Sequence, residues 1–228
     1  KNNTKLTFFV IGELYDWYPD LIRKIKKAGH EIAYHTHTHV LLRNKNLIEK
    51  QLALSAHFLK EFQPRGFQAP VIYFPRSGYE IIKKAGFRYS SSVYHSDIGI
   101  QPVDGVLEIP VSTFRLRDSK EEITWPRPMN FSRMLKEVPF GSSYFAALIG
   151  SLGMSYFLRA YEKMGRSAVL FIHNWQIFPP RKATYPNLSF LFRHPFYTPY
   201  LRNIKKDFEV LLRNFNFDKL EDYSIERA

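Results

Sequence analysis

The chain has 228 residues, which is long enough for one large domain whose core needs no disulfide. It contains no cysteine, so thiolate metal sites and cysteine nucleophiles are excluded. Its 33 Lys and Arg residues against 21 Asp and Glu give a net charge of +12, which is typical either of a protein with an anionic partner or of a solubilising basic surface.

Short apolar runs alternate with amphipathic stretches in the first part of the chain. The run KLTFFVIG (5–12) ends at a glycine and predicts a buried strand. A helix is expected in YPDLIRKIKKAG (18–29), and HEIAYHTHTHV (30–40) is again typical of a strand. Residues 46–62 predict a strong amphipathic helix with Asn46 as its N-cap.

The same alternation continues to the end of the chain. Further strands are expected at residues 65–74, 88–95, 105–116 and 167–175, helices at 77–87, 154–165 and 200–215, and a terminal strand and turn at 215–223. Strands and helices joined by short connections favour a parallel α/β architecture, most simply a barrel-like one. Without a linker or an internal repeat, residues 1–228 are expected to form a single domain.

One segment carries no charge. Residues 139–158, PFGSSYFAALIGSLGMSYFL, are 20 residues long, which is near the length that spans a bilayer. They include three Gly and four Ser, so the segment is only moderately apolar. It predicts a buried helix with a glycine-containing lead-in, with a membrane-contacting or substrate-lining surface as the alternative.

Four of the eight histidines fall within ten residues, at His30, His35, His37 and His39. On a straight strand that rises ~3.3 Å per residue, His35 and His39 would lie too far apart to share one ion. If the chain turns inside the cluster, they come within about 5–6 Å and can bind Zn²⁺ or another divalent transition metal. Hydrogen bonds from Thr36 and Thr38 to the backbone could support such a turn. Surface histidines are the alternative, and a catalytic zinc would need a third protein ligand.

His173 is the second candidate. It follows the apolar run AVLFI and should lie at the mouth of a buried strand. A histidine in this position can act as a general acid or base. The alternative is a core histidine bonded to a backbone carbonyl.

Five segments and the tail of the chain resemble one known family, in the same order and spacing. They are TFFVIGELYDWYPDLIRKIKKAGHEIAYHTHTHVLL, GFQAPVIYF, AGFRYSSSV, LEIPVST, AVLFIHNWQI and HPFYTPYLRNIKKDFEVLLRNFNFDKLEDY. Together they cover essentially the whole chain. They resemble the polysaccharide deacetylases (NodB-homology, family 4 carbohydrate esterases), and the later half is most similar to deacetylases associated with exopolysaccharide synthesis.

The resemblance implies a distorted (β/α) barrel and a hydrolase that cleaves the C–N bond of N-acetyl groups on a sugar in a polysaccharide or glycan precursor. It implies a divalent metal, usually zinc, that polarises the acetyl carbonyl. The family's two metal-binding histidines correspond to His35 and His39, with His37 on a variable position between them.

Other residues take their implied roles from the same resemblance. The backbone N–H of Val71, in the segment with Gln68, Ala69 and Pro70, would stabilise the oxyanion. His173 would protonate the leaving amine. The remaining substrate-binding candidates are Gln68, Pro70, Leu170, Trp175 and Tyr144, of which Leu170 and Trp175 would wall the acetyl pocket.

Three departures from the family pattern bear on activity. The family's opening Thr-Phe-Asp-Asp motif, which supplies the general base and the third metal ligand, has no counterpart in the six residues before Thr7. The first barrel strand and this motif are therefore expected upstream of the given sequence. Gln68 replaces an arginine that orients the base, and Ser90 replaces an aspartate that tunes the catalytic histidine. The two replacements together avoid an unpaired buried charge. The alternative function is a catalytically impaired glycan-binding protein on the same scaffold, and a metal-free structural remnant is a third hypothesis.

The expected partner is an N-acetylated glycan. The basic surface leaves open an anionic or lipid-linked form of it, and association with a membrane surface. Nucleic acid is not expected, because no module combines stacking aromatic residues with basic ones. The location, cytoplasmic or at the cell envelope, is left open.

Overall fold

The computed structural model describes residues 4–96, 101–116, 129–180, 188–194 and 197–225. Its main sheet has six strands in the order β1-β2-β3-β4-β7-β6, of which the first five are parallel and β6 is antiparallel to β7. These strands are β1 (Thr7–Val10), β2 (Glu31–Tyr34), β3 (Gly66–Phe67), β4 (Tyr89–Ser90), β6 (Gln101–Val103) and β7 (Val106–Glu108). The parallel α/β arrangement predicted from the sequence is confirmed. In the described part of the chain this sheet is open.

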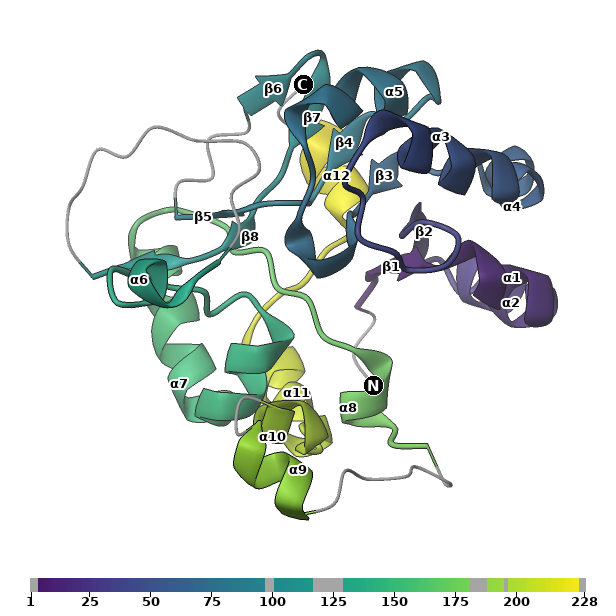
Figure 1. Ribbon diagram of the computed structural model, residues 1–228. Coiled ribbons are helices and arrows are strands. Elements are labelled where there is room, and N and C mark those ends of the chain that lie inside the picture. The colour runs from purple at the N-terminus through teal and green to yellow at the C-terminus, as the bar shows by residue number, and fades with distance from the viewer. Residues whose placement is uncertain (1–3, 97–100, 117–128, 181–187, 195–196, 226–228) are drawn as a thin grey trace.

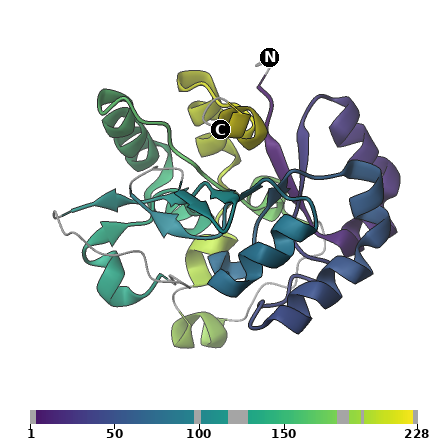
Figure 2. The same cartoon turned by 90° about the horizontal axis from the view of Figure 1, so that it is seen from above.

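Helices connect the parallel strands. They are α1 (Gly12–Trp17), α2 (Pro19–Lys27), α3 (Lys45–Leu54), α4 (Ala56–Phe62), α5 (Tyr79–Lys84) and two short 3-10 helices, η1 (Pro70–Ile72) and η2 (Arg76–Gly78). Seen from above, these helices line one side of the molecule, and the green helix of the second half lies on the opposite side (Figure 2).

The second half contains two small sheets and the longest described helix. Strand β5 (Tyr94–His95) pairs in parallel with β8 (Val111–Ser112), and β9 (Phe114–Arg115) pairs antiparallel with β10 (Glu137–Val138). The helices are α6 (Phe131–Met134), α7 (Ser143–Lys163), α8 (Asn174–Ile177), α9 (Leu188–Arg193), α10 (Thr198–Leu201), α11 (Lys205–Asn214) and α12 (Leu220–Ile225). Helices α10 and α11 pack against α7, and α9 lies below α10 in the view of Figure 1.

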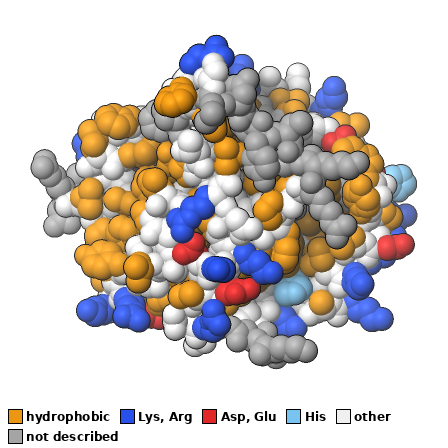
Figure 3. Space-filling view, turned by 90° about the horizontal axis from the view of Figure 1, so that it is seen from below, with side chains coloured by type: hydrophobic (Ala, Val, Ile, Leu, Met, Phe, Trp, Pro, Cys, Tyr) orange, Lys and Arg blue, Asp and Glu red, His pale blue; other side chains and the backbone are white. Residues whose placement is uncertain are grey.

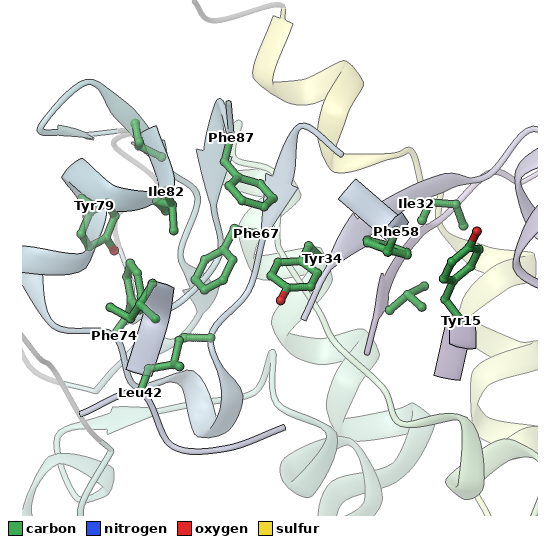
Figure 4. Close-up of a cluster of buried hydrophobic side chains, with 14 of the residues drawn as sticks. Tyr15, Ile32, Tyr34, Leu42, Phe58, Phe67, Phe74, Tyr79, Ile82 and Phe87 are labelled. Carbon is green, nitrogen blue, oxygen red and sulfur yellow. The ribbon is translucent and has the colours of Figure 1, made fainter. Parts of the chain in front are cut away.

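Two large hydrophobic clusters, and a small third one of Tyr89, Ile109 and Val169, form the core of the described residues. The first lies between the parallel strands and α1–α5, and its centre is aromatic: Tyr34 stacks on Phe87 with 5.7 Å between ring centroids and lies beside Phe58 and Phe67 (Figure 4). The second cluster packs α7 against α11 around Phe140. Burial of these large apolar side chains is the main stabilising contribution to both halves.

The helix expected at residues 46–62 is divided in two at Ser55. The N-cap is Asn44, whose side chain accepts a hydrogen bond of 3.0 Å from Leu47 N, so the prediction of Asn46 as cap was wrong. Asn44 has the extended backbone that a cap requires, whereas Asn46 is already inside the helix. The break at Ser55 places its hydroxyl 3.0 Å from that of Tyr34, which donates to it.

The C-terminal region also differs from the sequence prediction. The helix expected at 200–215 is interrupted between α10 and α11, where the buried Ile204 donates a backbone hydrogen bond to Gln176 O. Residues 215–223 include the start of α12 instead of a strand, because Leu220 N bonds to Thr7 Oγ1 and Glu221 N to Glu31. Residues 167–173 do not form the predicted strand, although two hydrogen bonds link Val169 to Ser112 and one links Phe171 to Gly141.

The uncharged segment lies mostly in α7 and is half buried. Met154 and Leu158 belong to the second core cluster, while Leu148, Leu152 and Tyr156 are exposed, so the predicted helix is present and buries one face only. Among the described helices, none has both the length and the apolarity needed to cross a bilayer. On the face shown in Figure 3, Lys and Arg side chains are scattered among hydrophobic ones instead of forming one basic patch.

Candidate active site

The chain turns within the histidine cluster that follows β2. Thr36 and His39 both have left-handed backbone conformations, with φ of 62° and 54°. The hydroxyl of Thr36 accepts a hydrogen bond of 3.1 Å from His39 N. This turn brings the rings of His35 and His39 to 4.8 Å between centroids. The predicted turn and the supporting role of Thr36 are therefore confirmed, whereas Thr38 bonds to the side chain of Gln51.

His37 belongs to a different environment. Its Nδ1 lies 3.1 Å from Ser55 Oγ and its backbone N–H donates to Gln51 Oε1 at 2.9 Å. Its Nε2 lies 3.7 Å from a carboxylate oxygen of Asp16. The three alternating histidines are therefore not equivalent, as the sequence predicted.

The ring of His35 is held in one tautomer. Its Nδ1 lies 2.8 Å from the backbone carbonyl of Gln68. A carbonyl only accepts, so Nδ1 carries the hydrogen and Nε2 keeps its lone pair. Burial, followed by the charge of His39, lowers the pKa of His35 to about 4. Burial also lowers the pKa of His39. Both rings are thus neutral at neutral pH, which is the form that binds a metal.

The loop after β3 passes beside His35. Gln68 is buried, Pro70 begins η1, and Val71 is 72% exposed. Val71 has φ of 59° and Ile72 has φ of 50°, both unusual for β-branched side chains. Such backbone strain is found where a loop is shaped for a ligand.

His173 is the N-cap residue of α8, at the end of the extended segment 167–173. Its Nδ1 lies 2.7 Å from Ser143 Oγ, and its ring stacks on Trp175 with 4.1 Å between centroids. Burial lowers the pKa of His173 to about 4, and the charge of His39 contributes in the same direction. The charge of His173 in turn acts on His35, so the three histidines share one site.

The hydroxyl that contacts His173 does not come from Ser90. Ser90, which the resemblance places where the family has an aspartate, bonds to Ser92. The physical reason is that Ser90 lies at the end of β4, within the sheet, whereas residues 167–173 pass beside Ser112 and Gly141 near the start of α7. Ser143, the first residue of α7, supplies the hydroxyl instead.

Aromatic side chains border His173. Tyr144 contacts Tyr200 edge to face at 5.4 Å between centroids, and Tyr200 lies 6.1 Å from the His173 ring. Trp175 is 45% exposed. Sequence reasoning missed Tyr200, although it lies in the aromatic tail PFYTPY. Leu170 packs against the second core cluster.

The metal-ligating residues are incomplete in the part of the chain that the structure describes. No group of three or more His, Asp or Glu side chains there could hold an ion. His35 and His39 fit a transition metal by ring distance, and His35 also by its tautomer, so together they would provide two protein ligands.

Residues 1–90 match the family model described as polysaccharide deacetylase. A peptidoglycan deacetylase-like protein of Gibberella zeae is 24% identical over 147 residues, which are 62% of this chain and 42% of the relative. A peptidoglycan-N-acetylglucosamine deacetylase of Bacillus cereus is 29% identical over 97 residues, 40% of this chain and 45% of the relative. The first part of the chain is thus similar to polysaccharide deacetylases of the NodB type. The matches span less than half of the length of these two relatives.

The chain has the expected type of fold. The crystal structure of a candidate polysaccharide deacetylase from Mycobacterium smegmatis superposes with a TM-score of 0.56 at 20% identity, covering 98% of this chain and 72% of that one. The predicted fold class, a (β/α) barrel of the deacetylase type, is thereby confirmed, and closure of the barrel is not seen among the described strands. At this identity the likeness concerns the fold alone.

Proposed function

We propose that this protein is a metal-dependent hydrolase that removes N-acetyl groups from a sugar in a polysaccharide or glycan precursor. The observation that carries the proposal is the pair of neutral imidazoles, His35 and His39, with ring centroids 4.8 Å apart and with His173 close enough to affect the pKa of His35. The deacetylase homologues support the same class of reaction.

We assign the metal to His35 and His39, with Zn²⁺ as the first candidate because two neutral imidazoles suit it. A bound divalent metal would supply Lewis acidity toward the acetyl carbonyl. The described residues contribute no third ligating side chain to the pair. We therefore assign the third ligand and the general base to a pair of aspartates outside the described residues.

The remaining steps are assigned to groups of this chain. The backbone N–H of Val71 would donate to the developing oxyanion, and the exposed, strained loop supports this role. His173 would deliver a proton to the leaving amine, with its ring oriented by Ser143. Because its pKa is about 4, the resting ring is neutral and must gain a proton during the reaction.

The substrate is proposed to lie between the His35 loop and the aromatic side chains. Gln68 and Pro70 would contact it from one side, and Trp175, Tyr144 and Leu170 from the other. The exposed indole of Trp175 supports stacking of a sugar ring. The net charge of +12 favours an anionic glycan, and a lipid-linked or membrane-associated substrate stays a prediction.

The test measures bound zinc and released acetate with N-acetylglucosamine oligomers and with peptidoglycan. The wild-type protein should bind zinc and release acetate, His35→Ala should lose both, and His173→Ala should keep zinc and lose acetate release. His37→Ala is the matched control, because His37 is in the same cluster but bonds to Ser55 and Gln51. Sugar binding without acetate release in the zinc-loaded wild type would favour the glycan-binding alternative.

A further inference from the structure

A chain of buried hydrogen bonds leads away from His35 through a single peptide unit. The carbonyl of Gln68 accepts from His35 Nδ1 at 2.8 Å. The N–H of Ala69, in the same peptide unit, donates to Ser92 Oγ at 2.9 Å. A peptide unit is planar and rigid, so the position of its N–H fixes the position of its C=O. The hydroxyl of Ser92 therefore sets where the acceptor of His35 lies.

The chain continues to a buried carboxylate. The hydroxyl of Ser90 donates to that of Ser92 at 2.8 Å. Glu108 lies opposite Ser90 in the pairing of β4 with β7. Its Oε1 accepts from Ser92 N at 2.6 Å, and its Oε2 accepts from the hydroxyl of Tyr79 at 2.7 Å. Ser90, Ser92 and Ala69 are fully buried, and Glu108 is 3% exposed.

These hydrogen bonds meet at Ser92. The His35 Nδ1–H donates to a carbonyl and the Ala69 N–H donates to the Ser92 hydroxyl, so both directions are fixed by the chemistry of the groups. The Ser92 hydroxyl also accepts from the Ser90 hydroxyl, and the Ser92 backbone N–H donates to the Glu108 carboxylate. Connected hydrogen bonds in a buried network polarise one another.

We propose that Ser92, Ser90 and Glu108 are positioning residues that orient the ring of His35 and strengthen the donor character of its Nε2 through the Gln68–Ala69 peptide. Partners that bond to the far nitrogen of a ligating histidine fix its tautomer and raise its basicity. Here that partner is a backbone carbonyl, and its own position is set by a carboxylate on β7. Where it concerns metal affinity, the inference rests on the proposed function.

Ser91 shows that the fold does not itself require hydrogen-bonded serines at the end of β4. Ser91 lies between Ser90 and Ser92, is also fully buried, and its hydroxyl has no hydrogen-bond partner among the described residues. A serine can thus be buried here without bonding. Ser91→Ala removes the same atom as Ser92→Ala, at the neighbouring position and at equal burial, so it is a matched control.

The first experiment uses the metal-free protein and does not depend on the proposed function. Amide hydrogen exchange at Ala69 and the ¹⁵N chemical shifts of the His35 ring are measured in the wild type, Ser91→Ala and Ser92→Ala. We expect Ser92→Ala to speed exchange at Ala69 by about tenfold or more, because the loss of a net hydrogen bond is worth ~1 kcal/mol or more when a buried donor is left unpaired. The His35 ring should shift toward a mixture of tautomers. Ser91→Ala should match the wild type in both readouts.

The second experiment measures Zn²⁺ affinity by competition with a chromophoric chelator. Ser92→Ala should weaken affinity by about 10-fold, the lower end of the effect of removing an outer partner of a ligand. Glu108→Gln keeps the shape and one acceptor oxygen and should act in the same direction with a smaller effect. If Ser92→Ala fails to fold, Glu108→Gln carries the test with the same readouts.

The possible failures are distinguishable. If Ser92→Ala and Ser91→Ala show the same exchange rate at Ala69 and the same His35 tautomer, the proposed positioning of His35 through Ser92 is overturned, whatever the metal affinity. A wild-type protein that binds no zinc, but shows the contrast between the two serine variants, would contradict the proposed function and leave the positioning of His35 through Ser92 supported.

Discussion

His35 and His173 lie at one site but are held by different kinds of group. The ring of His35 bonds to a backbone carbonyl at the end of β3, and the turn that brings His39 beside it is closed by Thr36. His173 lies after a segment with no assigned strand, and its ring is held by two side chains, Ser143 and Trp175. Both rings are neutral because burial lowers each pKa to about 4.

This difference indicates which part of the site is rigid. A backbone carbonyl beside a parallel sheet is positioned by many hydrogen bonds at once, so no single side-chain deletion nearby should release His35 completely. A side-chain hydroxyl and an indole can each be removed by one substitution, so the orientation of His173 should be easier to disturb. The predictions below use this contrast, from the largest expected effect to the smallest.

His35→Ala should have the largest effect. It removes one of the two described candidate ligands, so stoichiometric zinc and acetate release should be lost together. His37→Ala should retain both, because the ring of His37 bonds to Ser55. Zinc is measured by atomic absorption after gel filtration. Retention of full zinc and activity by His35→Ala would place the metal elsewhere.

His173→Ala should lower kcat without lowering the zinc content. The loss of a general acid typically lowers kcat by a factor on the order of 10²–10⁴. Zinc content should stay at the wild-type value, because His173 bonds to Ser143 and stacks on Trp175 and is not assigned as a ligand. Steady-state acetate release gives kcat and KM. A change confined to KM would mean that His173 binds the sugar instead.

Ser143→Ala should show a smaller effect of the same kind. Without the hydroxyl, the ring of His173 keeps its stacking on Trp175 but loses the partner at Nδ1. We expect kcat to fall by about tenfold, by analogy with the loss of a partner that orients a ligating histidine. Ser155→Ala, on the same helix α7, is the control. Equal kcat in the two variants would show that the hydroxyl does not position the ring.

The smallest effect concerns stability and pH in the metal-free protein. A folded-state pKa of about 4 for His173 lies below the ordinary value of 6.5, so the unfolded chain binds the proton more readily. The stabilising contribution of the neutral His173 ring should therefore be complete above pH 6.5 and be lost as the pH falls toward 4. The contribution of His173 is at most about 3 kcal/mol, since one pKa unit corresponds to about 1.4 kcal/mol. Urea unfolding of the wild type and His173→Ala between pH 4 and 7 measures it. The expected direction would be contradicted if the free energy of unfolding fell more steeply with falling pH in His173→Ala than in the wild type.

Local spacing was enough to predict the His35 side of the site. Two histidines four residues apart can meet only if the chain turns, and Thr36 was a visible means of making that turn. The parallel order of strands and helices was also readable, because apolar runs ended by glycines alternate with amphipathic helices. His37 was set apart by the family resemblance, which places it on a variable position between the two ligands.

The His173 side could not be predicted in the same way. Ser143 is 30 residues from His173, and no spacing rule connects a helix start with a residue in another segment. The end of the chain was read as a strand because FNFDKLEDY alternates apolar and polar residues, yet contacts of Leu220 and Glu221 with β1 and β2 favour a helix there. The hydrogen bonds through Ser92 could not be predicted either, because they depend on the pairing of β4 with β7.

The position of the metal tests the account most directly. Crystals grown with Zn²⁺ are measured on both sides of the zinc absorption edge, and the anomalous difference map is calculated. The account predicts a peak between the rings of His35 and His39, about 2.0–2.1 Å from an imidazole nitrogen of each. A peak beside His37 and Asp16, or no peak near the His35 and His39 rings in zinc-saturated crystals, would contradict it.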